Sequence, residues 1–250
     1  MRLAARSRAE GGIFYGFGFA LSGLRVFILI AIWQTLVEGG AEVATYSFVA
    51  LATYTILAEV FAEPLAARTE LRDTIWNGSI VGRTLQPVGL VGTYTAEAFG
   101  RWSLRFMTFG PIALGLGAAT GHLMAPRSPL PVVLLSLVLA VTVGLAIEFI
   151  FGSIIIGTRS NVWVIEQLRG ATAVLLSGQM IPLALLPWGL GDVLRWSPFA
   201  SVASAPLTLY VGTSAAIGTL ALQTFWAVTL WLIAGWAWAR SRTRLSALGG

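Results

Sequence analysis

Runs of apolar residues about 20 long recur along the whole chain, and each is long enough to cross a lipid bilayer as a helix. Polar and charged residues gather mainly between these runs. The pattern predicts six membrane spans in one all-α integral membrane domain that covers residues 1–250. The predicted spans lie near residues 13–37, 44–62, 103–123, 130–156, 163–183 and 215–239.

The arginines outside the spans indicate how the chain is oriented. In membrane proteins the cytoplasmic loops are enriched in basic residues. The loops of one side hold only Arg127 and Arg195. Both termini fall on the other side, which we predict to be cytoplasmic. That side holds Arg2, Arg6, Arg8, Arg68, Arg72, Arg83, Arg101, Arg105, Arg159, Arg169, Arg240, Arg242 and Arg244. This placement accounts for the net charge of +5, so nucleic acid is not an expected partner.

The segment from residue 64 to residue 102 is the one long stretch predicted on the cytoplasmic side. Pro64 ends the second span because proline breaks a helix. The charge spacing of residues 66–78 is typical of a short amphipathic helix that lies parallel to the membrane. Asn77 and Gly78 offer a stop signal for this helix.

The segment between the fifth and sixth spans, about residues 182–205, is apolar but repeatedly interrupted. Irregular backbone at membrane depth persists only where protein or water satisfies its polar groups. We therefore predict short helical pieces, turned by Gly189 and Gly191, that form a re-entrant hairpin in the outer leaflet. The interrupting residues are Pro182, Pro187, Asp192, Arg195 and Pro198.

The composition narrows the possible chemistry. Hydrophobic residues make up 56% of the chain and charged residues only 11%, whereas about a quarter of the residues in soluble domains are charged. Cysteine is absent and His122 is the only histidine, which excludes thiol catalysis and a histidine cluster for a metal. All 16 basic residues are arginine. Because the phosphate-binding loop of ATPases needs a lysine, we expect no nucleotide cofactor on this chain, and another chain must hydrolyse any ATP that drives it.

Two charged residues fall far from the ends of predicted spans, Arg25 in the first and Glu148 in the fourth. Charges in the membrane are costly and require an explanation. One hypothesis is that Arg25 and Glu148 meet and line a translocation path. The alternative, which is the commoner arrangement, is that Arg25 reaches the membrane interface and Glu148 bonds to a neighbouring helix or to water.

Other charged residues lie near the ends of the predicted spans. Glu59 and Glu63 are one helical turn apart, so they either relay protons or pair with arginines of the cytoplasmic segment, and pairing is the more usual role. Glu166 and Arg169 predict an interfacial salt bridge. The third span is predicted to begin inside a polar stripe with a spacing of four, which consists of Glu97, Arg101 and Arg105.

The order of these elements resembles that of the membrane subunits of type-2 ABC exporters. Residues 175–212, LLSGQMIPLALLPWGLGDVLRWSPFASVASAPLTLYVG, are similar to the L-S-G-x-x-I-P-L-x-x-L-P … P-F-x-x-x-x-x-P … Y-x-G run of one bacterial permease family in that group. Residues 77–89, NGSIVGRTLQPVG, resemble a cytoplasmic segment of the same family. The chain departs from that segment at Gln86, where the family pattern leads us to expect a basic residue.

The resemblance implies a permease subunit of an ATP-driven exporter in the bacterial cytoplasmic membrane, with an amphipathic or hydrophobic substrate such as a drug, a natural product or a lipid. Two separate ATP-binding subunits would hold ATP and Mg, and a second permease, identical or related, would complete the complex. Residues 66–78 would form the coupling helix that contacts the ATPase, and the hairpin would gate the outer exit. The implied coupling residues are Arg68, Arg72, Asp73 and Trp76, and the implied gate residues are Pro182, Pro187, Trp188 and Pro198.

A function of a different class remains open from the residues alone. A secondary transporter that works without ATP would need a proton carrier inside or beside its spans, and Glu59, Glu63 or Glu148 would serve. A membrane-embedded enzyme or scaffold is disfavoured because the sequence contains no reactive cluster.

Overall fold

A computed structural model describes residues 2–40, 46–84, 89–158 and 162–246, and all regular structure within these ranges is helical. The elements in chain order are α1 (Arg2–Glu38), α2 (Phe48–Val60), α3 (Ala62–Ala66), α4 (Leu71–Trp76), α5 (Ile80–Thr84), α6 (Leu90–Ala119), α7 (Leu130–Thr158), α8 (Val162–Leu176), the 3-10 turn η1 (Leu183–Leu185), α9 (Leu190–Leu194), α10 (Ser204–Val211) and α11 (Ala216–Ser246).

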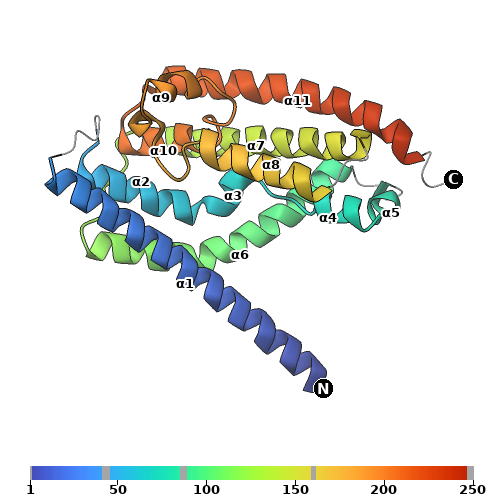
Figure 1. Cartoon of the computed structure of the whole chain (residues 1–250), viewed down its shortest axis with the longest axis horizontal. Coiled ribbons are helices and arrows are strands. Elements are labelled where there is room, and N and C mark those ends of the chain that lie inside the picture. The colour runs from blue at the N-terminus through green and yellow to red at the C-terminus, as the bar shows by residue number, and fades with distance from the viewer. Residues whose placement is uncertain (1, 41–45, 85–88, 159–161, 247–250) are drawn as a thin grey trace.

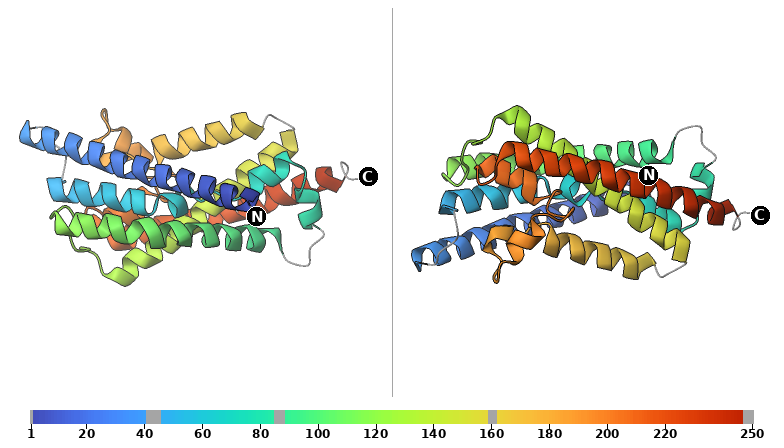
Figure 2. Two further views of the ribbon diagram at one scale, coloured as in Figure 1. Left: turned by 90° about the horizontal axis from the view of Figure 1, so that it is seen from below. Right: turned by 90° about the horizontal axis from the view of Figure 1, so that it is seen from above.

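The long helices form an elongated bundle in which their axes are roughly aligned (Figures 1 and 2). α7 lies inside it and packs along α11, while α1 crosses the bundle obliquely and its first turns project away from it (Figure 1). One end of the bundle holds α4, α5 and the C-terminal end of α11, and the other holds α9, the C-terminal end of α1 and the start of α2 (Figure 1). The N-terminal end of α1 points toward the α4 end, as the expected same-side termini require.

Six helices, α1, α2, α6, α7, α8 and α11, correspond in order to the six expected spans. Among the described residues, three stretches are long and apolar enough to cross a membrane, Gly16–Glu38, Leu130–Gly157 and Ala216–Ser241. α2 is apolar but has only 13 residues, and α8 has 15. The chain is therefore an all-α protein with several membrane-spanning helices, and the count of six crossings stays a prediction.

The core around α7 forms because this helix is apolar on every face, as expected for a helix surrounded by protein and lipid. Phe149 is fully buried, and its ring contacts the rings of Tyr94, Trp231 and Trp238. These contacts join α7 to α6 and α11, so the helix that carries Glu148 is held firmly in place.

The amphipathic helix expected over residues 66–78 is divided in the structure. α3 ends at Ala66, Ala67 adopts a left-handed conformation with φ 47°, and α4 begins only at Leu71. The expected start was therefore wrong, because the Thr69 hydroxyl accepts a hydrogen bond from the Leu71 N–H (3.1 Å) just before α4 begins. The stop signal is confirmed: Asn77 follows the last residue of α4, and Gly78 has φ +75°.

Residues 177–203 form short helical pieces, as the prolines predict, rather than another long helix. Gly189 takes a left-handed conformation directly before α9. Gly191 lies so close to η1 that a Cβ there would sit 2.1 Å from the carbonyl oxygen of Leu183, so only glycine fits. The short helical pieces agree with the proline pattern, and their arrangement as a re-entrant hairpin stays a prediction.

Candidate functional site

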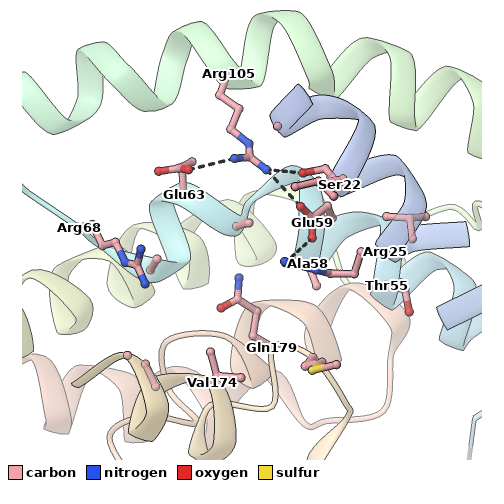
Figure 3. Close-up of a pocket in the computed structure, with 18 of the residues that line it drawn as sticks. Ser22, Arg25, Thr55, Ala58, Glu59, Glu63, Arg68, Arg105, Val174 and Gln179 are labelled. Carbon is pink, nitrogen blue, oxygen red and sulfur yellow. Dashed lines mark hydrogen bonds and ion pairs between the residues drawn. The ribbon is translucent and has the colours of Figure 1, made fainter. Parts of the chain in front are cut away.

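A cavity of about 520 Å³ lies between α1, α2, α3 and α8, a volume typical of small-molecule sites (Figure 3). α6 adds Arg105 to its wall, and the turn after α8 adds Gln179. The apolar part of the wall consists of Leu21, Val26, Leu29, Ala173, Val174 and Met180.

A cluster of ion pairs closes one side of this cavity (Figure 3). The buried carboxylate of Glu59 accepts from Arg25 Nη1 at 3.3 Å and from Arg105 Nη2 at 3.1 Å. Arg105 also donates to Glu63 at 3.0 Å and to the Ser22 hydroxyl at 2.8 Å. The expectation that Glu59 and Glu63 pair with the cytoplasmic arginines is confirmed for Arg105. The cluster joins α1, α2, α3 and α6.

Arg25 and Glu148 do not meet, so the hypothesis that they form a pair is wrong. Arg25 lines the cavity, and its partner is Glu59. Glu148 faces the segment after α3 instead, where its Oε1 accepts from the Thr69 N–H at 3.1 Å and the Thr69 hydroxyl at 3.0 Å. Its Oε2 lies 3.2 Å from Nε of Arg169. Glu148 therefore bonds to neighbouring helices behind the cavity wall, which is the alternative that the sequence left open.

Arg169 connects this buried carboxylate to the cavity. It is 3% exposed, pairs with Glu166 at 2.9 Å, and donates to the carbonyl oxygen of Ala66 at 3.3 Å. The pair with Glu166 is confirmed, and Arg169 lies inside the protein. Breaking one partner of a buried ion pair typically costs about 3–5 kcal/mol, so the link between α7, α8 and residues 66–69 is firm.

The segment that leads from α3 to α4 lies along one stripe of α7. Three positions of α7 at intervals of four face alternate residues of this segment. A Cβ on the first would lie 2.6 Å from the Cβ of Ala67, and a Cβ on the third would lie 2.5 Å from Cδ2 of Leu71. The facing pairs are Gly144 with Ala67, Glu148 with Thr69, and Gly152 with Leu71.

Sequence reasoning singled out Glu148 but missed the stripe around it. The signal was present as G-x-x-x-E-x-x-x-G in the fourth predicted span. Small residues at this spacing let a second backbone approach a membrane helix closely. The pattern does not say which segment approaches, and that information comes only from the structure.

α4 presents two different faces. Leu71 and Thr74 are buried, whereas Arg72, Asp73 and Trp76 are exposed, Trp76 by 73%. Arg72 and Asp73 pair with each other at 2.7 Å. These three expected coupling residues therefore share one exposed surface at the end of the bundle, available to a partner.

Arg68 lies elsewhere than the other expected coupling residues. It precedes α4 and lines the cavity, where it reaches toward Gly170 of α8 (Figure 3). Among the described residues it has no hydrogen-bond or ion-pair partner. Sequence reasoning could not separate it from Arg72, because the break at Ala67 was not expected.

The polar stripe of α6 (Glu97, Arg101 and Arg105) attaches α5 and the residue before α4 to the bundle. Its members pair with other elements rather than with one another: Glu97 binds Arg83 at 2.8 Å, and Arg101 binds Glu70. The hydrogen bond to Glu97 raises the pKa of Arg83. Tyr94 shares a hydrogen bond with the hydroxyl of Thr74 in α4, and burial raises the pKa of the Tyr94 phenol, which keeps it a neutral partner for that hydroxyl.

The expected gate residues lie at the opposite end of the bundle. Pro182 is buried, Pro198 is half-buried, and Pro187 and Trp188 are exposed, Trp188 by 92%. Tyr54 of α2 anchors the start of this region by donating to the carbonyl oxygen of Gly178 at 2.6 Å. A second cavity of about 550 Å³ lies between the hairpin, α10 and the start of α11.

Some expectations fall on residues that the structure does not describe. These residues include Gln86, at whose position the resemblance leads us to expect a basic residue, and Arg159. His122 contacts the ring of Phe48 and the hydroxyl of Thr120. Within the described ranges, no group of three His, Cys, Asp or Glu side chains is placed to hold a metal ion.

Comparison with protein families decides what this arrangement belongs to. A family model described as ABC-2 family transporter protein matches residues 19–249. The chain belongs to the ABC-2 family of transporter proteins. The resemblance to the membrane subunits of type-2 ABC exporters is thereby confirmed, and this ABC-2 protein is a multi-pass membrane subunit for transport. A search of the curated proteins finds no match.

Proposed function

We propose that the chain is the permease subunit of an ATP-driven exporter that moves an amphipathic or hydrophobic compound outward through the cavity between α1, α2, α3 and α8. ATP and Mg are bound by two separate ATP-binding subunits, consistent with the ABC-2 family in general. The ATPase contacts the exposed surface formed by Arg72, Asp73 and Trp76. The attachment of α4 to the cavity wall explains how motion of the ATPase reaches the cavity.

The observation that supports this proposal most strongly is the buried link from Thr69 through Glu148 to Arg169. Thr69 precedes α4 by two residues, and Arg169 lines the cavity. A displacement of α4 therefore shifts hydrogen bonds that end on the cavity wall, with no flexible connection between. A second connection runs through Glu70 and Arg101 to α6, whose Arg105 holds the ion cluster at the other side of the cavity.

The remaining partners are assigned by surface chemistry. α1 carries exposed apolar side chains along its length, including Phe17, Leu24 and Phe27. We propose that this face meets lipid and a second permease, identical or related, in the bacterial cytoplasmic membrane with both termini in the cytoplasm. The hairpin with Pro182, Pro187, Trp188 and Pro198 is proposed as the outer gate.

The rival is a proton-coupled secondary transporter. Its three candidate carriers are all engaged in ion pairs: Glu59 with Arg25 and Arg105, Glu63 with Arg105, and Glu148 with Arg169. Membership of the ABC-2 family also favours a separate ATPase. Sensitivity to an uncoupler separates the two functions experimentally.

The test uses the complex purified from its native membrane and reconstituted in inverted vesicles. We expect a nucleotide-binding subunit to co-purify, and ATP to drive accumulation of an amphipathic fluorescent dye even when an uncoupler is present. Arg72→Glu should reduce dye-stimulated ATP hydrolysis several-fold, because it reverses a charge on the surface that contacts the ATPase. Arg127→Glu, at the opposite end of the bundle, is the matched control.

Two results would contradict the proposal. A chain that purifies alone and transports only with a proton gradient supports the secondary transporter. Unchanged dye-stimulated ATP hydrolysis in Arg72→Glu removes the coupling role of the α4 surface.

A further inference from the structure

The cavity wall has an apolar part and a polar part (Figure 3). Leu21, Leu29 and Val174 supply apolar surface from α1 and α8. Arg68 and Gln179 face the same space from the segment after α3 and from the turn after α8. A compound that fills both parts must itself have an apolar body and a polar group.

The carboxylates that line the cavity have little capacity left for a cationic ligand. Both oxygens of Glu59 are occupied, one by Arg25 and the other by Arg105. Glu63 has one oxygen bound to Arg105. A cationic group would therefore find only the second oxygen of Glu63 without an arginine.

Hydrogen-bond donors, in contrast, remain free in the cavity. Arg68 makes no hydrogen bond or ion pair with any described residue, so the five N–H groups of its guanidinium are available. Arg25 binds Glu59 through Nη1 alone, and its side chain is 61% exposed. The amide group of Gln179 points into the cavity and makes no hydrogen bond with a described residue (Figure 3).

Arg169 also lines the cavity but does not add to this capacity. Glu148 and Glu166 already bind Arg169 from behind the wall, and their negative charges offset its positive charge. Recognition in the cavity therefore depends on the free donors of Arg68, Arg25 and Gln179 rather than on net charge.

We infer that the cavity selects amphipathic anions: the carboxylate, sulfate or phosphate group binds Arg68, with Arg25 and Gln179 beside it, and the apolar body lies against α1 and α8. This inference rests on the proposed function and names its substrate class. The planar fork of a guanidinium matches such groups with two parallel hydrogen bonds, and charge-assisted bonds of this kind are the strongest available in proteins. No other described cationic side chain of the cavity is free of a carboxylate.

The test compares two fluorescent dodecyl amphiphiles that share one tail and end in a carboxylate or a trimethylammonium group. Binding is measured on the purified complex in phosphatidylcholine nanodiscs. We expect the carboxylate probe to bind at least about tenfold more tightly, and Arg68→Gln to weaken its binding about tenfold. Arg68→Lys should retain part of the affinity because it keeps the charge, and Arg127→Gln, outside the cavity, should leave it unchanged.

The same measurement distinguishes the sources of the anion. Displacement of the carboxylate probe by added phosphatidylglycerol identifies a lipid head group as the ligand, whereas retention of the probe identifies a single-chain exported compound.

The inference is overturned if the ammonium probe binds as tightly as the carboxylate probe, if neither probe binds, or if Arg68→Gln leaves binding unchanged. These results concern the cavity alone, since ATP-driven dye transport by the same complex would still support the proposed function. Failure of the proposed function would be detected separately, because no ATPase subunit would co-purify with the chain.

Discussion

At the scale of single residues, the close approach of the segment after α3 to α7 depends on positions with no side chain. Gly144 faces the Cβ of Ala67, a rigid atom that no rotamer change can move. Ala67 itself holds a left-handed conformation, which is unfavourable for a residue with a Cβ. The turn that separates the cavity wall from α4 is therefore stabilised by packing against α7 rather than by its own preference.

Gly144→Ala should destabilise the protein, because the new Cβ would lie 2.6 Å from the Cβ of Ala67 and one backbone must shift. Overpacking of this kind typically costs about 1–3 kcal/mol. We expect a lower midpoint of thermal unfolding in detergent, together with weaker coupling of ATP hydrolysis to dye transport.

The control for this change is Gly235→Ala in α11, where an added Cβ meets no atom within 4 Å. Alanine is the better helix former, so its midpoint should stay the same or rise slightly. Equal midpoints for Gly144→Ala and the unchanged protein would show that the approach of Ala67 to α7 is not tight.

At the scale of elements, buried ions join α7, α8 and the start of α4. The side chains of Glu148 and Arg169 are 6% and 4% exposed. Such pairs contribute little net stability compared with apolar residues of the same size, yet loss of one partner is severe. Their position between α4 and the cavity favours a role in coupling over a role in stability.

This role predicts a difference between single and double changes. Glu148→Met alone should cost about 3–5 kcal/mol of unfolding free energy, because Arg169 loses the more deeply buried of its two carboxylate partners. Glu148→Met combined with Arg169→Met should recover much of that stability in thermal unfolding, since both buried charges are gone.

Dye-stimulated ATP hydrolysis should nevertheless stay low in the double variant, because the hydrogen bonds to Thr69 and Ala66 are absent. Recovery of both stability and stimulated hydrolysis would mean that the pair serves the fold alone.

At the scale of the whole molecule, charge and apolar surface are arranged along one axis. The proposed coupling surface of α4, formed by Arg72, Asp73 and Trp76, lies at one end of the bundle, and residues 182–198 lie at the other (Figure 1). The cavity between α1, α2, α3 and α8 sits between them. An ATP-driven exporter needs this order, with the ATPase contact, the binding space and the exit placed in sequence.

The orientation can be checked directly because the chain contains no cysteine. Ser79→Cys and Ala125→Cys place single exposed thiols near the two ends of the bundle. In intact cells a membrane-impermeant maleimide should label Ala125→Cys at once and Ser79→Cys only after permeabilisation, since arginine-rich loops stay in the cytoplasm. The opposite pattern would reverse the predicted topology.

The sequence by itself determined the all-helical membrane class, the order of the long helices, the stop at Asn77 and the short helical pieces of residues 177–203. These features follow from local properties: the length of an apolar run, a proline without an N–H, and a glycine with positive φ. The tertiary structure decided which charges meet. Arg25 pairs with Glu59 and Glu148 with Arg169 because helix packing brings distant residues face to face. It also divided α3 from α4, because the contacts of residues 67–71 with α7 and the hydroxyl of Thr69 outweigh the helical preference of the sequence.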